Sequence, residues 1–460
     1  MSNKVFDIAV IGAGPAGMSA ALEAEKHGAS VVLLDEQLQP GGQVYRNVLT
    51  ATRRQFTILG SDYAKGAALA KPFSESTVLH LAGVSVWQVT QGGHIGFSKD
   101  GKADQIRARH IIVATGATER PVPIPGWTLP GVLTAGAAQI LLKSGGFAAP
   151  SAVLIGAGPL LYLVAAQMAA AGCPPKALIE TQTQKDLRAA LEHLGGALRG
   201  WRYLLKGIGL IARLKRAGVQ RYSAATEIEI SGSDRAEAVS FKAKGEHHRI
   251  EAETFLVHLG VVPNTQVTRS LRLEHRYDDT QRCFKPISDA YGHTSCNAIS
   301  IAGDGAGIGG ANVAALSGRI AALGALHKLE MISQSTRDEV ARPLLLKREK
   351  ELAIRSFLDT AYAPPVEILR PADGTIICRC EEVTAGDIRR FAALGCRGPN
   401  QAKAFGRSGM GPCQGRFCGL TVTEILAKET GQSQDETGAF RIRTPLKPVT
   451  LGELAAYEAE

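Results

Sequence analysis

Apolar runs that end in glycine-rich turns set the pattern of the first part of the chain. Residues 7–11 (DIAVI) are followed by GAGPAG at 12–17, by small residues up to residue 28 and by a second apolar run, SVVLLDE, at 30–36. This succession predicts a buried strand, a tight turn, a helix and a parallel strand. It is the βαβ context in which a G-x-G-x-x-G turn binds a dinucleotide.

The same succession occurs a second time. AVLIGAGPLLYLVAAQMAAAG at 152–172 predicts strand, turn and helix, and KALIE at 176–180 predicts the next strand. This segment lies in a stretch without charged residues from Ser144 to Pro175, long enough to resemble a membrane span. Its glycines, prolines and nucleotide-type turn favour a buried strand, turn and helix instead.

Composition fits a folded protein of several domains. The 460 residues correspond to about three domains at roughly 150 residues each. Hydrophobic residues make up 45% and charged residues 21%. Glycine is abundant, with 51 residues, but it has no collagen-like period and is grouped in short segments. A fibrous or disordered chain is therefore excluded, and the glycines point to turns shaped around ligands.

Most of the net charge of +9 comes from one segment. Arg188 to Arg221 contains eight Lys or Arg residues and one acid, Glu192, interleaved with aromatic and aliphatic residues. The pattern fits a basic helical surface for an acidic partner, an anionic lipid or a nucleic acid. A solvated helix face, with Arg and Lys stems lying over apolar surface, is the alternative. No nucleic-acid-binding motif accompanies the charge, so no nucleic acid partner is expected.

The eight cysteines are unevenly placed. The first 172 residues contain none, and five lie between residues 378 and 418. The N-terminal residues lack the basic and apolar regions of a signal peptide, so a disulfide framework is not expected. We expect a reducing, cytoplasmic compartment and a local metal or cluster site.

The first glycine turn supplies the candidate cofactor site. Gly12 permits the tight turn, Gly14 lets a pyrophosphate approach, and Gly17 allows the helix to pack closely on the strand. The helix N-terminus offers free N–H groups to phosphates. The cofactor-contacting residues expected in this turn are Gly12, Gly14, Pro15, Ala16 and Gly17. Asp35 ends the second strand, where its carboxylate can accept hydrogen bonds from a ribose, and Glu36 is the neighbouring candidate.

Two later segments resemble the signatures of the two-dinucleotide-binding flavoproteins. They are IIVATGATERP at 111–121 and ISIAGDGAGIGGANVAALSGRIAA at 299–322. The resemblance implies FAD as the cofactor. It also implies that Thr115 and Gly116 mark the crossing back to the flavin domain, and that Asp304, after Gly303, binds the ribityl chain. PGGQVYR, with Gly42 and Gln43, matches the segment that runs along the flavin in such proteins.

The second glycine turn is degenerate. Gly156 and Gly158 keep the first two positions, but Leu161 occupies the third, where a side chain should alter the packing of helix on strand. Glu180 could serve a ribose. A bound adenine nucleotide, an empty structural Rossmann layer and catalytic use of NAD(P)H all stay open. Disulfide reduction is excluded, because no cysteine follows GGQ and the inserted domain holds only Cys173.

Four cysteines near the end form two close pairs. Cys378 and Cys380 form CxC, and Cys413 and Cys418 form CxxxxC, a set that could hold zinc or an iron–sulfur cluster. Glycines 406, 409, 411 and 415 would let backbone N–H groups approach sulfides, Thr384 is placed to cap a helix ending near Leu394, and Cys418 lies near another helix start. The segment resembles 2Fe-2S domains of the bacterioferritin-associated ferredoxin type. The other cysteines, at 173, 283, 296 and 396, are expected in the core.

Nearly the whole chain resembles the alpha-type subunits of hetero-oligomeric amino-acid dehydrogenases, a group that includes opine oxidases, D-hydroxyproline dehydrogenases and hydrogen cyanide synthases. The resemblance rests on GAGPLLYLVAAQ, CRCEEVTAGDIR, GMGPCQGRFCG and RIRTPLKPVTLGEL. It implies that a beta subunit of the glycine or sarcosine oxidase type oxidises the C–N bond at its own FAD. Electrons would cross an FMN at the subunit interface to this chain's FAD and 2Fe-2S cluster.

The resemblance further allows a small third iron–sulfur subunit, an acceptor such as a quinone or cytochrome, and a position at the inner face of the membrane. It explains why no residue stands out as a catalytic base. Two alternatives from other classes are a self-contained NAD(P)H-dependent ferredoxin-type reductase and a non-enzymatic redox sensor.

The expected fold class is α/β, with a split FAD domain, an inserted second Rossmann domain and a small 2Fe-2S domain. We expect the FAD domain at 1–120 and 261–330 and the inserted domain at 121–260. A helical linker at 331–372, the 2Fe-2S domain at 373–430 and a tail at 431–460 complete the chain.

Overall fold

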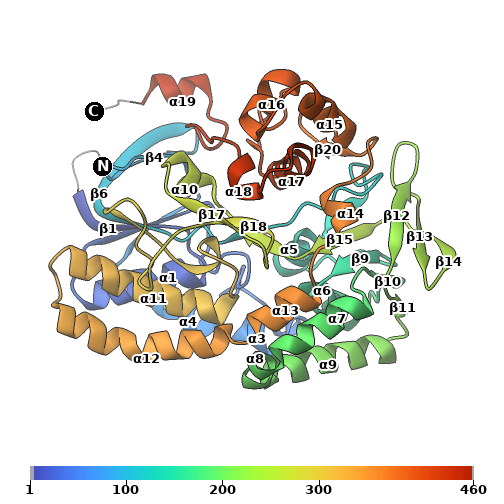
Figure 1. Ribbon diagram of the computed structural model, residues 1–460. Coiled ribbons are helices and arrows are strands. Elements are labelled where there is room, and N and C mark those ends of the chain that lie inside the picture. Colours follow the sequence, from blue (N-terminus) through green and yellow to red (C-terminus); the bar gives the residue numbers. More distant parts are fainter. Residues whose placement is uncertain (1–4, 458–460) are drawn as a thin grey trace.

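The computed structural model describes residues 5–457, and its first layer is a mixed sheet (Figure 1). The sheet contains β1 (Val5–Ile11), β2 (Val31–Asp35), β3 (Leu79–Ala82), β4 (Ser85–Val89), β5 (His94–Lys99), β6 (Lys102–Val113) and β19 (Ile299–Ile301). Its order is β3-β2-β1-β6-β5-β4, and β19 also pairs with β6. The long strand β6 runs antiparallel to β5 along its first half and parallel to β19 over its last three residues.

Two helices far apart in sequence pack against this sheet. They are α1 (Pro15–Lys26) and α11 (Ala311–Lys328). Their contact is so close that a Cβ on Gly318 would lie 2.0 Å from the carbonyl oxygen of Ala16. The same half of the molecule contains α2 (Arg53–Leu59), α3 (Ser61–Ala64), α4 (Ala67–Ser74), α10 (Gln266–Ser270), β17 (His275–Asp278), β18 (Cys283–Pro286) and η2 (Gly303–Gly305).

The second layer is a separate parallel sheet, in the order β11-β10-β9-β15-β8. Its strands are β8 (Val132–Thr134), β9 (Val153–Ala157), β10 (Ala177–Glu180), β11 (Gln220–Tyr222) and β15 (Phe255–Leu259). Its helices are α5 (Ala135–Gly145), α6 (Pro159–Ala170), α7 (Gln184–Ala190), η1 (Leu191–His193), α8 (Leu194–Arg199) and α9 (Trp201–Arg216). A small antiparallel sheet follows, with β12 (Thr226–Ser231), β13 (Ala238–Ala243) and β14 (Glu246–Glu251).

The chain crosses between the two sheets through a pair of short antiparallel strands. These are β7 (Ala117–Glu119) on the way out and β16 (Val261–Pro263) on the way back. The first domain is therefore split by the second, as the sequence predicted. The fold class, a two-dinucleotide-binding α/β arrangement, is confirmed.

The C-terminal part begins alongside α11 and α7 and ends above the first sheet (Figure 1). It contains α12 (Gln334–Leu352), α13 (Arg355–Ala361), α14 (Val366–Leu369), β20 (Ile376–Cys378), β21 (Val383–Thr384), α15 (Ala385–Ala393), α16 (Pro399–Gly406), α17 (Gly419–Thr430), α18 (Gln434–Thr437) and α19 (Leu451–Ala455). Ile377 and Val422 belong to the same apolar core as Ile111 of β6. The last residues pack on β4, where the Tyr457 ring meets Trp87 at 4.9 Å.

Among the described residues, no helix combines the length and apolar character needed to cross a membrane.

Candidate functional site

The first glycine turn has the shape that a pyrophosphate site requires. A Cβ on Gly17 would lie 1.8 Å from the carbonyl oxygen of Gly12, so the helix rests directly on the turn. Gly12, at φ +109°, lies against the backbone of Ala114. Gly14 has free space around it except towards Gly42, where a Cβ added to Gly42 would lie 2.8 Å from the Gly14 Cα. Because no side chain caps α1, its first N–H groups stay available to an anion.

Asp35 holds this turn in place. Its Oδ2 accepts a hydrogen bond from the Ala13 N–H at 2.5 Å, and its Oδ1 accepts one from the Gln37 N–H at 2.7 Å. Glu36 is half exposed and forms an ion pair with Lys447 of the C-terminal tail. Burial lowers the pKa of Lys447. Sequence reasoning missed Lys447, since nothing in its local pattern indicates a contact more than four hundred residues away.

The segment at Gly42 and Gln43 is held by the inserted domain. Lys143 of α5 donates to the Gln43 carbonyl oxygen at 2.9 Å and to Gln139 Oε1 at 2.9 Å. Gln139 in turn donates to Gln167, which donates to the Leu59 carbonyl oxygen. Burial of Lys143 lowers its pKa to about 7. This buried polar chain joins the two halves of the molecule beside Gly42 and Gln43, and no sequence signal marks it.

The remaining predicted flavin residues gather where the central strands end. The Asn264 N–H donates to the Gly116 carbonyl oxygen at 3.0 Å, and the Thr115 hydroxyl approaches the Asn264 carbonyl oxygen at 3.4 Å. Asp304 Oδ1 accepts the N–H groups of Gly309 and Gly310, both at 2.9 Å.

Gly303, at φ +75°, has no room for a side chain, because its Cβ would lie 2.8 Å from that of Ala16. Near these residues the strands β1, β6 and β19 are parallel neighbours, so the carboxyl ends of the three strands lie at one edge of the sheet. Thr115, Gly116, Gly303 and Asp304 therefore meet the first glycine turn at one site.

The second glycine turn has a different environment. Glu180 is fully buried, and its carboxylate accepts hydrogen bonds from Tyr162, from Arg221 at 2.7 Å and from Gln182 at 3.0 Å. Leu161 is also fully buried, in the core beneath α6. Because the Glu180 carboxylate is closed off from solvent and already accepts hydrogen bonds from three side chains, the arrangement favours a structural Rossmann layer over a nucleotide site.

The four predicted cysteines come together in two pairs. Cys380 Sγ lies 3.6 Å from Cys413 Sγ. Cys418 donates to Cys378, which together with backbone N–H groups lowers the pKa of Cys378 to about 6. A Cβ on Gly411 would lie 2.2 Å from the Cys380 Cβ, so this approach requires glycine. Within residues 5–457, no group of three or more His, Cys, Asp or Glu side chains is placed to hold one metal ion.

The helices around the cysteines agree with the sequence. Thr384 caps α15 in a capping box with Asp387, and Leu394 is the C-cap. Cys418 is the residue before α17. Among the other cysteines, Cys396 and Cys283 are buried as expected, whereas those at 173 and 296 are partly exposed. Cys296 nevertheless packs against the core of the first sheet, so core packing was the wrong expectation only for Cys173, which lies in the loop after α6.

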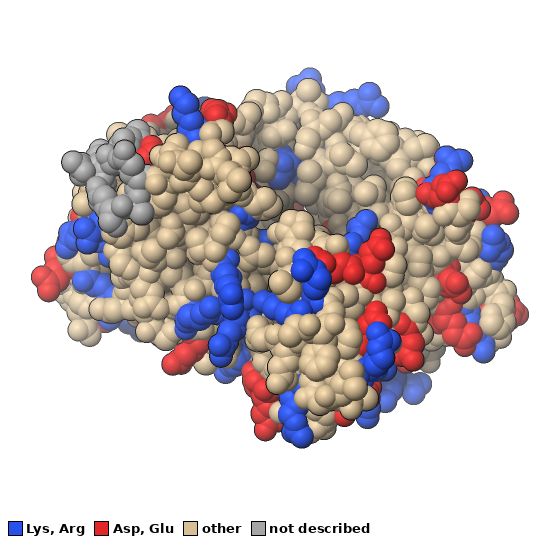
Figure 2. Space-filling model, turned by 90° about the horizontal axis from the view of Figure 1, so that it is seen from above, with Lys and Arg blue, Asp and Glu red and all other residues tan. Residues whose placement is uncertain are grey.

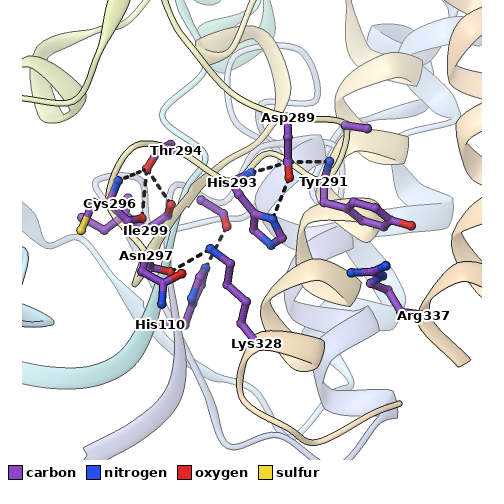
Figure 3. Close-up of polar contacts among 12 residues, drawn as sticks. His110, Asp289, Tyr291, His293, Thr294, Cys296, Asn297, Ile299, Lys328 and Arg337 are labelled. Carbon is purple, nitrogen blue, oxygen red and sulfur yellow. Dashed lines mark hydrogen bonds and ion pairs between the residues drawn. The ribbon is translucent and has the colours of Figure 1, made fainter. Parts of the chain in front are cut away.

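Another set of titratable side chains lies beside α11, and each of them has a hydrogen-bond partner nearby (Figure 3). His110 shares a hydrogen bond of 2.8 Å with Ser300, and His293 shares one of 2.9 Å with Asp289. Lys328 donates to the Asn297 carbonyl oxygen at 3.1 Å. Burial, with smaller effects of Lys328 and His293, lowers the pKa of His110 to about 3. These contacts tie the 289–299 loop to the sheet, so the group is structural.

A cavity separates the crossing strands from the cysteine domain. Asn264 and Arg269 line one side, and Gln414 and Arg416 line the other. Gln266 also lines it, and its buried Oε1 has no hydrogen-bond partner among the described residues. Figure 2, which views the molecule from the side of the C-terminal domain, shows a hollowed centre with Lys and Arg side chains at its margin. The arrangement can receive an anionic group between the two domains.

Comparison with known proteins agrees with this architecture. Residues 6–318 match the pyridine nucleotide-disulphide oxidoreductase family, and residues 373–458 match the sarcosine oxidase A3 domain. The chain is 44% identical to the opine oxidase A subunit of Agrobacterium tumefaciens (strain Ach5), over 98% of this chain and 91% of that protein. It is 33% identical to hydrogen cyanide synthase subunit HcnB of Pseudomonas aeruginosa, over 96% of each chain.

The crystal structure of L-proline dehydrogenase from P. horikoshii superposes with a TM-score of 0.70 and 19% identity, over 98% of this chain and 79% of that chain. This likeness shows the fold. The flavin-site geometry and these matches identify an FAD-dependent oxidoreductase. The chain belongs to the pyridine nucleotide-disulphide oxidoreductase family and, within it, to the family of opine oxidase A subunits.

Proposed function

We propose that this chain is the electron-transfer subunit of a hetero-oligomeric dehydrogenase that oxidises the C–N bond of an opine or another secondary amino acid. A partner of the glycine or sarcosine oxidase type, with its own FAD, would oxidise the substrate. The observation that carries the proposal is the pairing of four cysteines in a domain that shares its core with the flavin sheet. Similarity to the A subunits of opine oxidases supports the substrate class.

The cysteine geometry supports a 2Fe-2S cluster more than a single zinc ion. A tetrahedral zinc needs four ligands around one point, whereas a two-iron cluster takes two protein ligands on each iron. Cys380 with Cys413, and Cys378 with Cys418, form two such pairs. The backbone N–H groups that reach Cys378 favour a thiolate there. When bound, FAD supplies two-electron chemistry and the cluster supplies one-electron transfer.

The residues of the flavin site would bind and orient the cofactor. The first N–H groups of α1 would hold the pyrophosphate and Asp35 the adenosine ribose, while Asp304, fixed by two backbone N–H groups, would hold the ribityl chain. Lys143 keeps the Gly42–Gln43 segment in position through the Gln43 carbonyl oxygen. A carboxylate that is already oriented loses little entropy when it binds.

The cavity between the domains is the place we propose for the phosphate group of the FMN that the family resemblance implies. Arg269 and Arg416 face it from opposite sides, and an arginine pair is well suited to a phosphate group. Arg269 is held by a hydrogen bond from its Nε to Thr265 and lies over the Phe284 ring at 4.7 Å. Simultaneous replacement of both arginines by methionine should lower the FMN content of the complex and leave FAD unchanged.

The decisive experiment purifies the chain with the subunits that co-elute and measures bound flavin, iron, acid-labile sulfide and the EPR spectrum of the reduced protein. Cys413→Ser should abolish the cluster signal, whereas Cys396→Ser, a matched change at a buried cysteine, should retain it. A zinc protein without iron would contradict the cluster. A complex in which no opine or amino acid reduces an artificial acceptor would contradict the substrate class.

A test with NADPH distinguishes the proposed function from that of a self-contained NAD(P)H-dependent reductase. A self-contained NAD(P)H-dependent reductase would lose its flavin absorbance as soon as NADPH is added to the purified chain. The enclosed Glu180 predicts that NADPH leaves the flavin oxidised.

A further inference from the structure

The helices α8 and α9 carry an apolar stripe on the outside of the molecule. Trp201, Leu205 and Ile208 are spaced by three or four residues, which places them on one side of α9, and Leu198 lies at the end of α8, just before it. They are 61%, 53%, 56% and 63% exposed, respectively. Figure 1 shows α8 and α9 along the lower edge of the molecule. We call these four residues the α9 stripe.

The α9 stripe is distinct from the face that holds α9 in the fold. Leu210 and Leu214 are buried and pack into the core beneath α6. At 100° per residue, those two positions lie on the side of the helix opposite Trp201 and Leu205. The helix therefore has one apolar face inside and a second apolar face that its own fold leaves in water. Exposed apolar residues gathered in this way mark an interaction surface.

Cations flank the stripe. From Leu194 to Arg216 there are six Lys or Arg residues and no acid. Arg202, Arg213 and Arg216 are exposed. By helical spacing they project along one flank of the stripe, and Arg202 also stacks on the Trp201 ring at 5.8 Å. Lys206 is neutralised in part by Asp62 at 2.6 Å.

We infer that the α9 stripe and its flanking cations dock this protein on the surface of an anionic lipid bilayer. Leucine, isoleucine and tryptophan on one face of a helix, with Arg and Lys beside them, enter the boundary between headgroups and acyl chains, while the cations meet lipid phosphates. The charge argues against a second copy of this chain, because a two-fold contact through this face would bring like charges together. The inference is independent of the proposed function.

The test uses the full chain with vesicles of phosphatidylcholine alone or mixed with phosphatidylglycerol, and follows co-sedimentation. We expect binding to the anionic vesicles only, weakened by added salt. Replacement of Arg202, Arg213 and Arg216 by glutamine should weaken binding about 100-fold, at roughly fivefold per cation. The double variant L205S/I208S should also lose binding.

Matched controls are available on α12. Arg342, Lys347 and Lys350 are exposed there, and their replacement by glutamine changes the net charge equally. Leu346 is 62% exposed, so L346S serves as the apolar control. Both control variants should bind vesicles like the unmodified chain.

Intrinsic fluorescence gives a second readout. Of the three tryptophans, Trp87 and Trp127 are 3% and 6% exposed, whereas Trp201 is 53% exposed. Insertion of the α9 stripe should shift the emission to shorter wavelength, and W201F should remove the shift.

Three results would overturn the inference. One is the absence of binding to anionic vesicles, and another is binding that the α9 variants do not change. The third is loss of self-association or of a co-purifying subunit in L205S/I208S while vesicle binding persists, which would make the face a protein interface.

Discussion

Replacement of Asp304 by alanine tests the flavin site most directly, because one carboxylate has two separable roles. Its Oδ1 accepts two backbone N–H groups at the start of α11, and we propose that its Oδ2 binds the ribityl chain of FAD. The variant D304A removes both interactions. The variant D304N keeps an acceptor oxygen for the two N–H groups but has no charge.

The two roles have different magnitudes. Loss of the capping interaction should lower the free energy of unfolding of the apoprotein by about 1–2 kcal/mol. Loss of a hydrogen bond from a cofactor hydroxyl to a charged oxygen costs about 1.5–3 kcal/mol, which corresponds to about a 10- to 150-fold rise in the Kd for FAD. D304N should keep most of the stability and still bind FAD more weakly.

The assay is a fluorescence titration of the apoprotein with FAD, together with denaturant unfolding of the same samples. Asp387→Ala is the matched control, since Asp387 accepts the Thr384 N–H in the capping box of α15, within the cysteine domain. It should lose comparable stability and keep its affinity for FAD. An unchanged Kd for FAD in D304A would refute the role of Asp304.

Three further changes test other parts of the structure. Gly17→Ala would place a Cβ 1.8 Å from a backbone oxygen of its own turn, so the purified protein should lack flavin absorbance, whereas Gly452→Ala, with no atom within 4 Å, should be yellow. Arg221→Met leaves the buried Glu180 carboxylate without its cation and should lower the denaturant midpoint by an amount equivalent to about 3 kcal/mol. The double variant E180Q/R221M should recover most of this loss. Equal midpoints for the single and the double variant would disprove the buried ion pair. Burial lowers the pKa of His110 from 6.5 to about 3, so the unfolded chain binds more protons than the folded chain between these pH values. The contribution of neutral His110 to the free energy of unfolding is therefore complete above pH 6.5 and declines as the pH falls towards 3. Between pH 6.5 and 5, His110→Gln should therefore lose about 2 kcal/mol less stability than the unmodified chain, as judged by denaturant midpoints at each pH, and identical pH profiles would show that His110 is not the group responsible.

Local patterns predicted the elements that local physics determines. The glycine turn at 12–17 and the cap at Thr384 each follow from a few neighbouring residues. Steric limits on a glycine or a capping side chain act within one turn of the chain, so they are visible in the sequence.

Contacts between distant segments could not be predicted in this way. Lys447 reaches Glu36, and Lys143 reaches Gln43, across segments with no shared pattern. Glu180 shows that a local pattern can also suggest a ligand that the packed structure does not favour. Its position at a strand end suggested a ribose ligand, but Tyr162 and Arg221 occupy its carboxylate, and only the packed structure reveals their positions.

Because the strands of the flavin sheet are far apart in sequence, the two domains become complete at different stages of synthesis. Strand β19 must join β6 although nearly two hundred residues separate them, and the Glu36–Lys447 contact needs almost the whole chain. On the ribosome, the inserted parallel sheet has all its strands by residue 259, while the flavin domain still lacks β19 of its sheet and the helix α11 that packs on that sheet. The inserted domain can therefore fold first, and the flavin site is completed only late in synthesis. Chains truncated between residues 260 and 298 should for this reason have a folded inserted domain and an incomplete cofactor site.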